Sequence, residues 1–225
     1  MRHSNAAPRN PLVDDHAAGS NSHTPSERGV ALKIAYLGPP GSFSEEALRS
    51  DARFDHDEWV PFSSVADVIA AVLRERADAA LLPVENAISG IVGESTRALA
   101  DAPELAIERE LVIPVHLELL AARGASLGSV RRVLSFPVAT AQCRRFLDER
   151  LPYAEIEATN STSEAARRVT EIGSDDTAAI ASSRAGKRHG LVVLASSIED
   201  SAENWTRFVL VRRIRDEPVV PSSVR

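Results

Sequence analysis

The sequence predicts an α/β fold with two lobes, because apolar segments typical of buried strands alternate with segments of helical periodicity. The first strand is followed at once by a glycine turn and a capped helix. The alternation of strands and helices continues in the second half of the chain, and a last strand follows it. We therefore expect two lobes of about 90 residues each, with the final segment returning to the first lobe and a cleft between the two.

Structure should begin near Ala31. The segment LKIAYLG predicts a short buried strand, which breaks at the turn GPPG over residues 38–41. Ser42 or Ser44 can cap the helix that follows, and the two glutamates in its first turn interact favourably with the helix dipole. The first element is therefore a strand, glycine turn and helix N-terminus.

Further strands and helices continue this lobe. EWVPF predicts a strand, and apolar residues at helical spacing predict an amphipathic helix over 64–77. The apolar segment 79–84 predicts a buried strand that ends in Glu85 and Asn86, and a glycine-containing loop leads to a helix over roughly 92–101. Polar residues thus stand at the end of a strand, where open α/β sheets bind ligands.

The second lobe repeats the alternation. Strands are expected over 131–135 and 154–159, with one helix over 139–150 between them. Ser161 or Thr162 can cap the next helix, in which Glu164 stands at the capping-box position after Ser161. Further strands are expected over 178–181, 191–195 and 205–212.

These elements set the expected domain boundaries. We predict a disordered extension over 1–30, a folded domain over 31–215 and a tail over 216–225. Within the folded domain, we expect lobe 1 to take in about 31–110 and 192–215, and lobe 2 about 111–191.

Composition argues against several classes of protein. The net charge is −6 with scattered basic residues, so we expect no nucleic-acid partner. No apolar run approaches the roughly 20 residues of a membrane-spanning helix, and the N-terminal segment lacks the apolar core of a signal peptide. We therefore expect a cytoplasmic protein without a membrane partner, which fits its single cysteine, Cys143.

The sequence predicts neither a metal nor a cofactor. Within the folded region the histidines His56, His116 and His189 are not spaced with another ligand as a metal site requires. GPPGSF lacks the glycine spacing of nucleotide-binding loops. Cys143 falls on the apolar stripe of its predicted helix, so we interpret it as a core residue rather than a nucleophile.

The remaining candidates are hydroxyls, amides and charged groups at the ends of predicted elements. Helix N-termini bind anions and arginine can hold a carboxylate through two parallel hydrogen bonds, so the set would suit a small dianionic organic acid. For each residue alone, a structural role as a cap, a surface charge or a strand residue competes with this interpretation. The candidates are Ser42, Ser44, Glu85, Asn86, Ser135, Gln142, Ser161, Thr162, Thr206 and Arg207.

Five segments occur in order between residues 32 and 213: YLGPPGSFSEEA, LLPVENAISGIVGES, VLSFPVATAQCRRFL, NSTSEAA and ENWTRFVLV. In this order they resemble the GPxGTFS, PxENSxxGxV, SHPQALAQC, (A/N)STAxAA and NxTRF motifs of the prephenate dehydratase family. The resemblance implies a two-lobed fold like that of the type II periplasmic binding proteins. It also implies that the substrate, prephenate, binds in the cleft between the lobes.

The resemblance implies an activity and residue roles as well. The family removes carbon dioxide and a hydroxyl from prephenate to give phenylpyruvate, and it needs no cofactor. The family's catalytic threonine falls on Thr206, with Glu85 or a water to relay the proton. The implied substrate-binding residues are Ser42, Phe43, Ser44, Asn86, Ser135, Gln142, Ser161, Thr162, Asn204, Arg207 and Phe208.

The chain departs from the family motifs in three places. Ala87 stands where the family usually has serine, and Phe136-Pro137-Val138 stands where it usually has His-Pro-Gln. We interpret these as side chains that do not touch substrate, because Ser135 and Gln142 keep their identity. Only 17 residues follow Phe208, so we expect the regulatory ACT domain of the family to be absent.

Alternative functions stay open at this point. They are a non-aromatising prephenate decarboxylase, an arogenate dehydratase and a binding module without catalysis. The intact Thr206-Arg207-Phe208 favours the dehydratase, since a decarboxylase has no use for a group that assists departure of the hydroxyl. The pathway would be L-phenylalanine biosynthesis or a related aromatic pathway, and the chain could form a homodimer.

Overall fold

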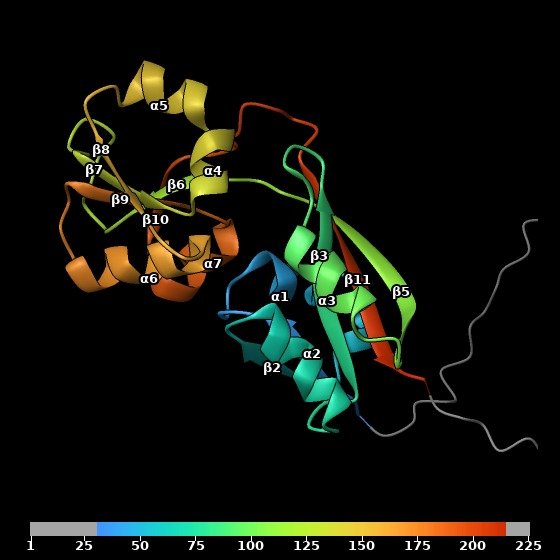
Figure 1. The fold of residues 1–225 in the computed structure, drawn as a ribbon. Helices are drawn as coiled ribbons and strands as arrows, with labels where there is room; N and C mark the ends of the chain where they lie inside the picture. The colour runs from blue at the N-terminus through green and yellow to red at the C-terminus, as the bar shows by residue number, and fades with distance from the viewer. Residues whose placement is uncertain (1–30, 215–225) are drawn as a thin grey trace, which may run out of the picture. The chain divides into compact units, whose positions relative to one another are not determined.

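The computed structural model describes residues 31–214, and the predicted extension 1–30 and tail 216–225 lie outside the described residues. Two sheets, each with its own helices, form the two lobes (Figure 1). The mixed α/β fold confirms the predicted fold class. Within 31–214, no helix is both long enough and apolar enough to cross a membrane.

The first sheet has the strand order β2-β1-β3-β11-β5, and the short β4 pairs with β3. β1 runs parallel to β2 and β3, whereas β11 runs antiparallel between β3 and β5. The carboxyl ends of β1, β2 and β3 therefore meet the beginning of β11 at one end of the sheet. The strands are β1 (Lys33–Leu37), β2 (Glu58–Phe62), β3 (Ala79–Asn86), β4 (Gly90–Ile91), β5 (Leu105–Pro114) and β11 (Trp205–Arg213).

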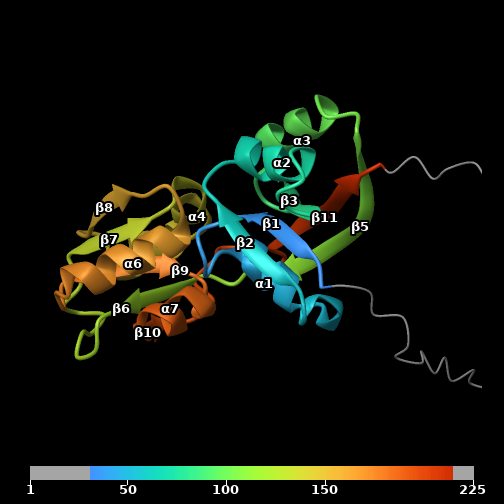
Figure 2. The ribbon, with the colours of Figure 1, turned by 90° about the horizontal axis from the view of Figure 1, so that it is seen from below.

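Helices cover both faces of this sheet (Figure 2). They are α1 (Phe43–Arg49), α2 (Val65–Leu73) and α3 (Gly93–Ala100), and a short 3-10 helix over Ala52–Phe54 follows α1. Leu48 of α1 packs in one core cluster with Phe208, while Val72 of α2 packs in the other with Val209. Adjacent residues of β11 thus enter different cores, as expected when side chains alternate across a strand.

The second sheet has the order β10-β6-β9-β7-β8. β7 runs parallel to β8 and β9, whereas β6 runs antiparallel to β9 and β10. Helices α4 and α5 lie on one face and α6 and α7 on the other (Figure 1). The elements are β6 (Glu118–Ala121), β7 (Arg132–Ser135), α4 (Pro137–Gln142), α5 (Arg144–Arg150), β8 (Glu155–Ala158), α6 (Thr162–Ile172), β9 (Thr177–Ala181), α7 (Ser183–His189) and β10 (Val192–Ala195).

The helix caps decide between the alternatives left by the sequence. Ser42, not Ser44, caps α1, and its hydroxyl accepts a hydrogen bond from the main-chain nitrogen of Glu45 at 3.4 Å. Ser161, not Thr162, caps α6 and accepts from the main-chain nitrogen of Glu164 at 3.0 Å. In each case the serine satisfies an amide that the first helical turn leaves without a partner.

The predicted boundary of lobe 1 at residue 192 is wrong. β10 pairs with β6, with Val192 opposite Ala121, so residues 192–195 belong to the second sheet. Hydrogen bonding to a strand of lobe 2 decides this assignment, and the apolar composition of the segment carries no information about its partner.

Two predicted helices differ from those observed. The predicted helix 139–150 is divided into α4 and α5, because the backbone of Cys143 leaves the helical region at φ −113° and ψ 20°. The predicted helix 64–77 ends at Leu73, and a turn with Glu75 at φ 57° leads from it toward β3. β5, β6 and α7 were not predicted from the sequence.

Candidate active site

Three buried carboxamide side chains connect to the Thr206 hydroxyl. Asn86 ends β3, Thr206 is the second residue of β11, and the sheet register places them opposite each other. Asn204 directly precedes β11, and Gln142 ends α4 in the second lobe. All four are buried: Thr206, Asn86 and Gln142 are each 9% exposed and Asn204 is 3% exposed. Residues far apart in sequence thus form one polar cluster inside the protein.

The Asn86 amide nitrogen faces β11. Three acceptors share the two hydrogens of its Nδ2: Thr206 Oγ1 at 3.0 Å, the main-chain oxygen of Trp205 at 2.9 Å and Asn204 Oδ1 at 3.0 Å. A main-chain carbonyl can only accept, so the atom facing Trp205 has to be the nitrogen. The Thr206 oxygen therefore accepts from Asn86, and its own hydrogen is left to donate to another group.

Gln142 joins the two lobes through the same cluster. Its Nε2 donates to Asn86 Oδ1 at 3.1 Å, and its Oε1 accepts from Asn204 Nδ2 at 3.1 Å. Both ends of the Gln142 amide, and both ends of the Asn204 amide, thus have partners within the protein. Buried polar groups gain most when every donor and acceptor is satisfied, so the cluster should be rigid.

Glu85 and Arg207 lie on the opposite face of the sheet from this cluster. Glu85 directly precedes Asn86 in β3 and Arg207 directly follows Thr206 in β11, and neighbouring residues of a strand point to opposite faces. Arg207 Nε lies 3.2 Å from Glu85 Oε2, and its Nη1 lies 2.7 Å from Glu110 Oε2. The Arg207 guanidinium also stacks over the Trp205 ring, 5.7 Å from its centre. The structure therefore does not bring Glu85 next to Thr206, and Arg207 already has two carboxylate partners.

The segment from Ser42 to Ser44 lies at the start of α1. Besides capping the helix, the Ser42 hydroxyl donates to the main-chain oxygen of Leu37 at 3.1 Å. Phe43 packs against the core clusters of both lobes, and Ser44 is buried. This segment therefore positions the first lobe against the second.

The glycine turn before α1 contacts the second lobe directly. Ser163 Oγ donates to the main-chain oxygen of Pro40 at 2.6 Å, and Ser182 Oγ donates to that of Gly41 at 3.4 Å. Gly41 has φ +88°, and a Cβ atom there would lie 2.9 Å from Ser163 Oγ. Glycine is thus required both by the backbone conformation and by the close approach of α6.

A pocket of about 550 Å³ opens between the lobes beside this turn. Pro61 and Phe62 line it from the first lobe, and Ser161 and Arg167 line it from the second. Thr162, the first residue of α6, is 9% exposed. The structure therefore places Ser161 at a cavity formed by both lobes, at the N-terminus of a helix that can attract an anion.

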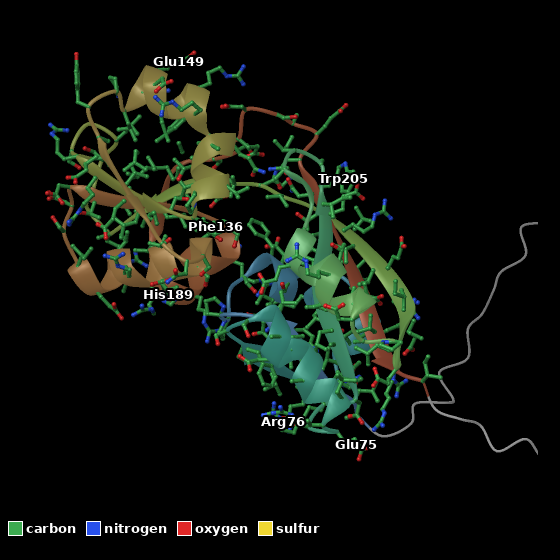
Figure 3. The ribbon with its side chains drawn as sticks, in the orientation of Figure 1. Glu75, Arg76, Phe136, Glu149, His189 and Trp205 are labelled. Atoms are coloured by element: carbon green, nitrogen blue, oxygen red, sulfur yellow. The ribbon has the colours of Figure 1, made fainter. Side chains whose placement is uncertain are left out.

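Ser135 and Phe208 are core residues. The Ser135 side chain is fully buried, and its hydroxyl donates to the main-chain oxygen of Ile180 at 3.3 Å. Phe208 is 1% exposed and packs in the core beside α1. Phe136, by contrast, is 38% exposed at the start of α4, and Trp205 marks the start of β11 (Figure 3).

Cys143 and the possible metal ligands take no part in this cluster. Cys143 is fully buried in the core of the second lobe, and burial raises the pKa of its thiol well above the ordinary value. Over residues 31–214, no three His, Cys, Asp or Glu side chains are arranged to hold a metal ion. A thiol held in its neutral form in an apolar core is a poor nucleophile.

Comparison with known proteins shows the family. The family model for prephenate dehydratase matches residues 34–216, which include all five motif segments. The chain belongs to the prephenate dehydratase family. This membership accounts for the polar residues at the strand and helix ends, which are the residues that the five motifs contribute.

Two curated relatives carry different substrate names. Arogenate dehydratase 5 of Arabidopsis thaliana, a chloroplast protein, is 38% identical over 197 residues, which are 88% of this chain and 45% of the relative. Prephenate dehydratase of Lactococcus lactis is 37% identical over 180 residues, which are 80% of this chain and 63% of the relative. The chain therefore spans less than two thirds of the length of either relative.

A solved structure shows a similar fold. The prephenate dehydratase of Arthrobacter aurescens, crystallised in complex with L-Phe, is 34% identical to this chain with a TM-score of 0.76. The match covers 83% of this chain and 62% of that protein. The two-lobed fold predicted from the motifs is thereby confirmed.

Proposed function

We propose that this chain catalyses the decarboxylative dehydration of prephenate to phenylpyruvate. The observation that carries the proposal is the hydrogen bond from Asn86 Nδ2 to Thr206 Oγ1, which leaves the hydroxyl hydrogen of Thr206 available as a donor. A buried, preorganised donor can stabilise charge as it develops on a leaving group. Family membership supplies the substrate class, and the Thr206 hydroxyl supplies the chemistry that distinguishes dehydration from decarboxylation alone.

The reaction breaks two bonds of the prephenate ring. The ring carboxylate leaves as carbon dioxide, and the electron pair of the broken C–C bond moves into the ring. The C–O bond on the opposite carbon then breaks, so that the ring becomes aromatic and the departing hydroxide takes up one proton to become water. Thr206 donates its hydrogen bond to this departing oxygen, and aromatisation provides the driving force.

Thr206 needs a fixed orientation for this role, and the three amides provide it. Asn86 binds the Thr206 oxygen, and Asn86 is itself held by Asn204 beside β11 and by Gln142 of the second lobe. We therefore assign Asn86, Gln142 and Asn204 to positioning of Thr206 rather than to direct contact with substrate. A donor held in place before the reaction does not have to reorganise in the transition state.

The carboxylates of prephenate need partners of their own. We assign one of them to the N-terminus of α6, where Ser161 lines the pocket between the lobes. Helix N-termini attract anions through their free amide groups. Arg207 is a weaker candidate than the sequence suggested, because Glu85 and Glu110 already bind its guanidinium. We assign the Glu85–Arg207–Glu110 group to the stability of the sheet.

The preference between prephenate and arogenate follows from one group of the substrate. Arogenate carries an amino group where prephenate carries a keto oxygen, and the product is then L-phenylalanine. We retain arogenate as the second candidate because the plant relative named for that activity is 38% identical. A cytoplasmic location, a place in phenylalanine biosynthesis and a homodimer stay predictions.

Product identification tests the proposal. Purified protein is incubated with prephenate and, in parallel, with arogenate. The assay is run at pH 8 because prephenate aromatises spontaneously in acid. We expect phenylpyruvate, with carbon dioxide released in equal amount. A non-aromatic hydroxy acid would indicate a decarboxylase, L-phenylalanine formed faster from arogenate would indicate an arogenate dehydratase, and unchanged substrates would indicate a binding module. The Thr206→Val variant is the matched control.

A further inference from the structure

Ser89 contacts the Asn86 side chain within the tight turn between β3 and β4. The Asn86 Oδ1 atom accepts hydrogen bonds from the main-chain nitrogens of Ile88 at 3.1 Å and Ser89 at 3.0 Å. It also accepts from the Ser89 hydroxyl at 3.0 Å. Position 87 is alanine, so Ser89 carries the only hydroxyl between Asn86 and Gly90.

Four donors thus converge on one carbonyl oxygen, three from this turn and the fourth from Gln142 Nε2 at 3.1 Å. A half-turn of the Asn86 amide would place its NH₂ group against main-chain N–H groups, which can only donate. It would also place the Asn86 oxygen against the carbonyl of Trp205, which can only accept. The turn therefore keeps Asn86 Nδ2 directed at Thr206 Oγ1.

We infer that Ser89 is a positioning residue for Thr206, acting through the Asn86 amide. The inference rests on the proposed function and deepens it, since it adds a residue that no motif assigned. Ser89 is exposed whereas Asn86 is buried, so the Ser89 hydroxyl contributes little to packing. Its effect should therefore appear in the turnover number and not in stability.

The test replaces Ser89 with alanine and measures steady-state kinetics with prephenate. We expect kcat to fall about 3- to 10-fold, the effect of losing one hydrogen bond, with KM changed by less than about twofold. Ser89→Thr keeps the hydroxyl and should restore kcat. Ser50→Ala is the matched control, because the Ser50 hydroxyl also belongs to an exposed residue and donates to a main-chain oxygen at 2.7 Å, outside the site. It should leave kcat unchanged.

The Thr206→Val background tests the route of the effect. If Ser89 acts through Asn86 and Thr206, Ser89→Ala should leave the residual kcat of Thr206→Val unchanged, because residues that act as a unit are not additive. An equal loss in both backgrounds, or wild-type kcat for Ser89→Ala, would overturn the inference. A fall in melting temperature that Ser89→Thr reverses without restoring kcat would also overturn it.

The two proposals fail in different ways. If the wild-type protein releases no phenylpyruvate from prephenate, the proposed function is wrong and the inference about Ser89 is wrong with it. If the wild type does so and Ser89→Ala matches it, only the inference is wrong.

Discussion

Asn86 and Thr206 are 120 positions apart in the sequence, yet Asn86 Nδ2 lies 3.0 Å from Thr206 Oγ1 across the β3–β11 pairing. The bond has a direction that the neighbouring carbonyl of Trp205 imposes, since that carbonyl accepts from the same nitrogen. Thr206 is therefore an acceptor toward Asn86, and its own hydrogen is left to donate to another group. The chemistry proposed for this site depends on that asymmetry.

Thr206→Val should abolish most of the activity while leaving the fold intact. Valine keeps the β-branched shape of the strand residue and removes the donor. We expect kcat with prephenate to fall roughly 100- to 10,000-fold and KM to change much less, because the lost interaction is made mainly in the transition state. The kcat of Thr206→Ser should lie between that of the wild type and that of Thr206→Val. The measurement is steady-state kinetics, with circular dichroism as the control for folding. A kcat of Thr206→Val within a few-fold of wild type would exclude the mechanism.

Near-isosteric changes at Asn86 and at its neighbour Glu85 should affect kcat to very different extents. Asn86→Asp replaces the Nδ2 donor with an oxygen that faces the Trp205 carbonyl, so kcat should fall at least about 100-fold. Glu85→Gln alters only the ion pair with Arg207 on the other face, where both side chains are partly exposed, so kcat and KM should stay within about threefold. A large loss of kcat in Glu85→Gln would restore Glu85 as a proton relay.

The stability of the protein should depend on pH through Glu46. Its Oε2 is buried, and no partner for it occurs among residues 31–214. Burial is the main cause that raises the pKa of this carboxyl above its ordinary value. The folded state then holds the proton more tightly than the unfolded state, so Glu46 lowers stability as pH rises through the interval between the unfolded and the raised folded pKa.

Glu46→Gln should therefore raise the melting temperature at pH 8 and change it less near pH 4, where the carboxyl is mostly protonated in both states. Glu149→Gln is the control, because Glu149 is exposed on α5 (Figure 3). Thermal unfolding of both variants across this pH range is the measurement. If Glu46→Gln raises the melting temperature near pH 4 as much as at pH 8, or more, the expected pH dependence is wrong.

We expect Cys143 to contribute to the stability of the core and not to the reaction. In the native protein a maleimide should label its thiol only on the timescale of unfolding, since the thiol is fully buried and its pKa is raised. Cys143→Ser should lower the free energy of unfolding by about 1–3 kcal/mol, because a hydroxyl is placed in an apolar core, while kcat stays within about twofold. Rapid labelling of the folded protein, or a tenfold loss of kcat with unchanged stability, would argue for a chemical role.

Elements with a strong local pattern could be predicted from the sequence, and those without one could not. β1 and β9 are apolar after their first residue, and the sequence predicts both. β5 lies at the edge of its sheet and carries Glu108, Arg109 and Glu110, so its composition does not distinguish it from a loop. α7 has the sequence SRAGKRH, which lacks an apolar stripe. Ser182 and Gly190 cap this helix, and Ala185 is its one residue in the core cluster of the second lobe.

The sequence identified most residues of the candidate site but not the contacts between them. The motifs identified Asn86, Gln142, Asn204 and Thr206, and the structure brings these four together. No signal in the sequence indicated that the amides bind one another, because hydrogen bonds across strands and lobes follow from register and lobe contacts. Ser89 carried no motif signal either, and only its distance from Asn86 Oδ1 singles it out.

By itself, the sequence determined the α/β class, the family, the order of the motifs and which side chains could carry chemistry, because each of these resides in local pattern or in the identity of residues. Only the tertiary structure decided which side chains act together. Side chains alternate across a strand, so Glu85 and Asn86, adjacent in the chain, point to opposite faces of the sheet. The pairing of β3 with β11 then places Asn86 against Thr206 and Glu85 against Arg207. Strand register, a property of two segments over 100 residues apart, therefore separates the candidate site from the ion pair beside it.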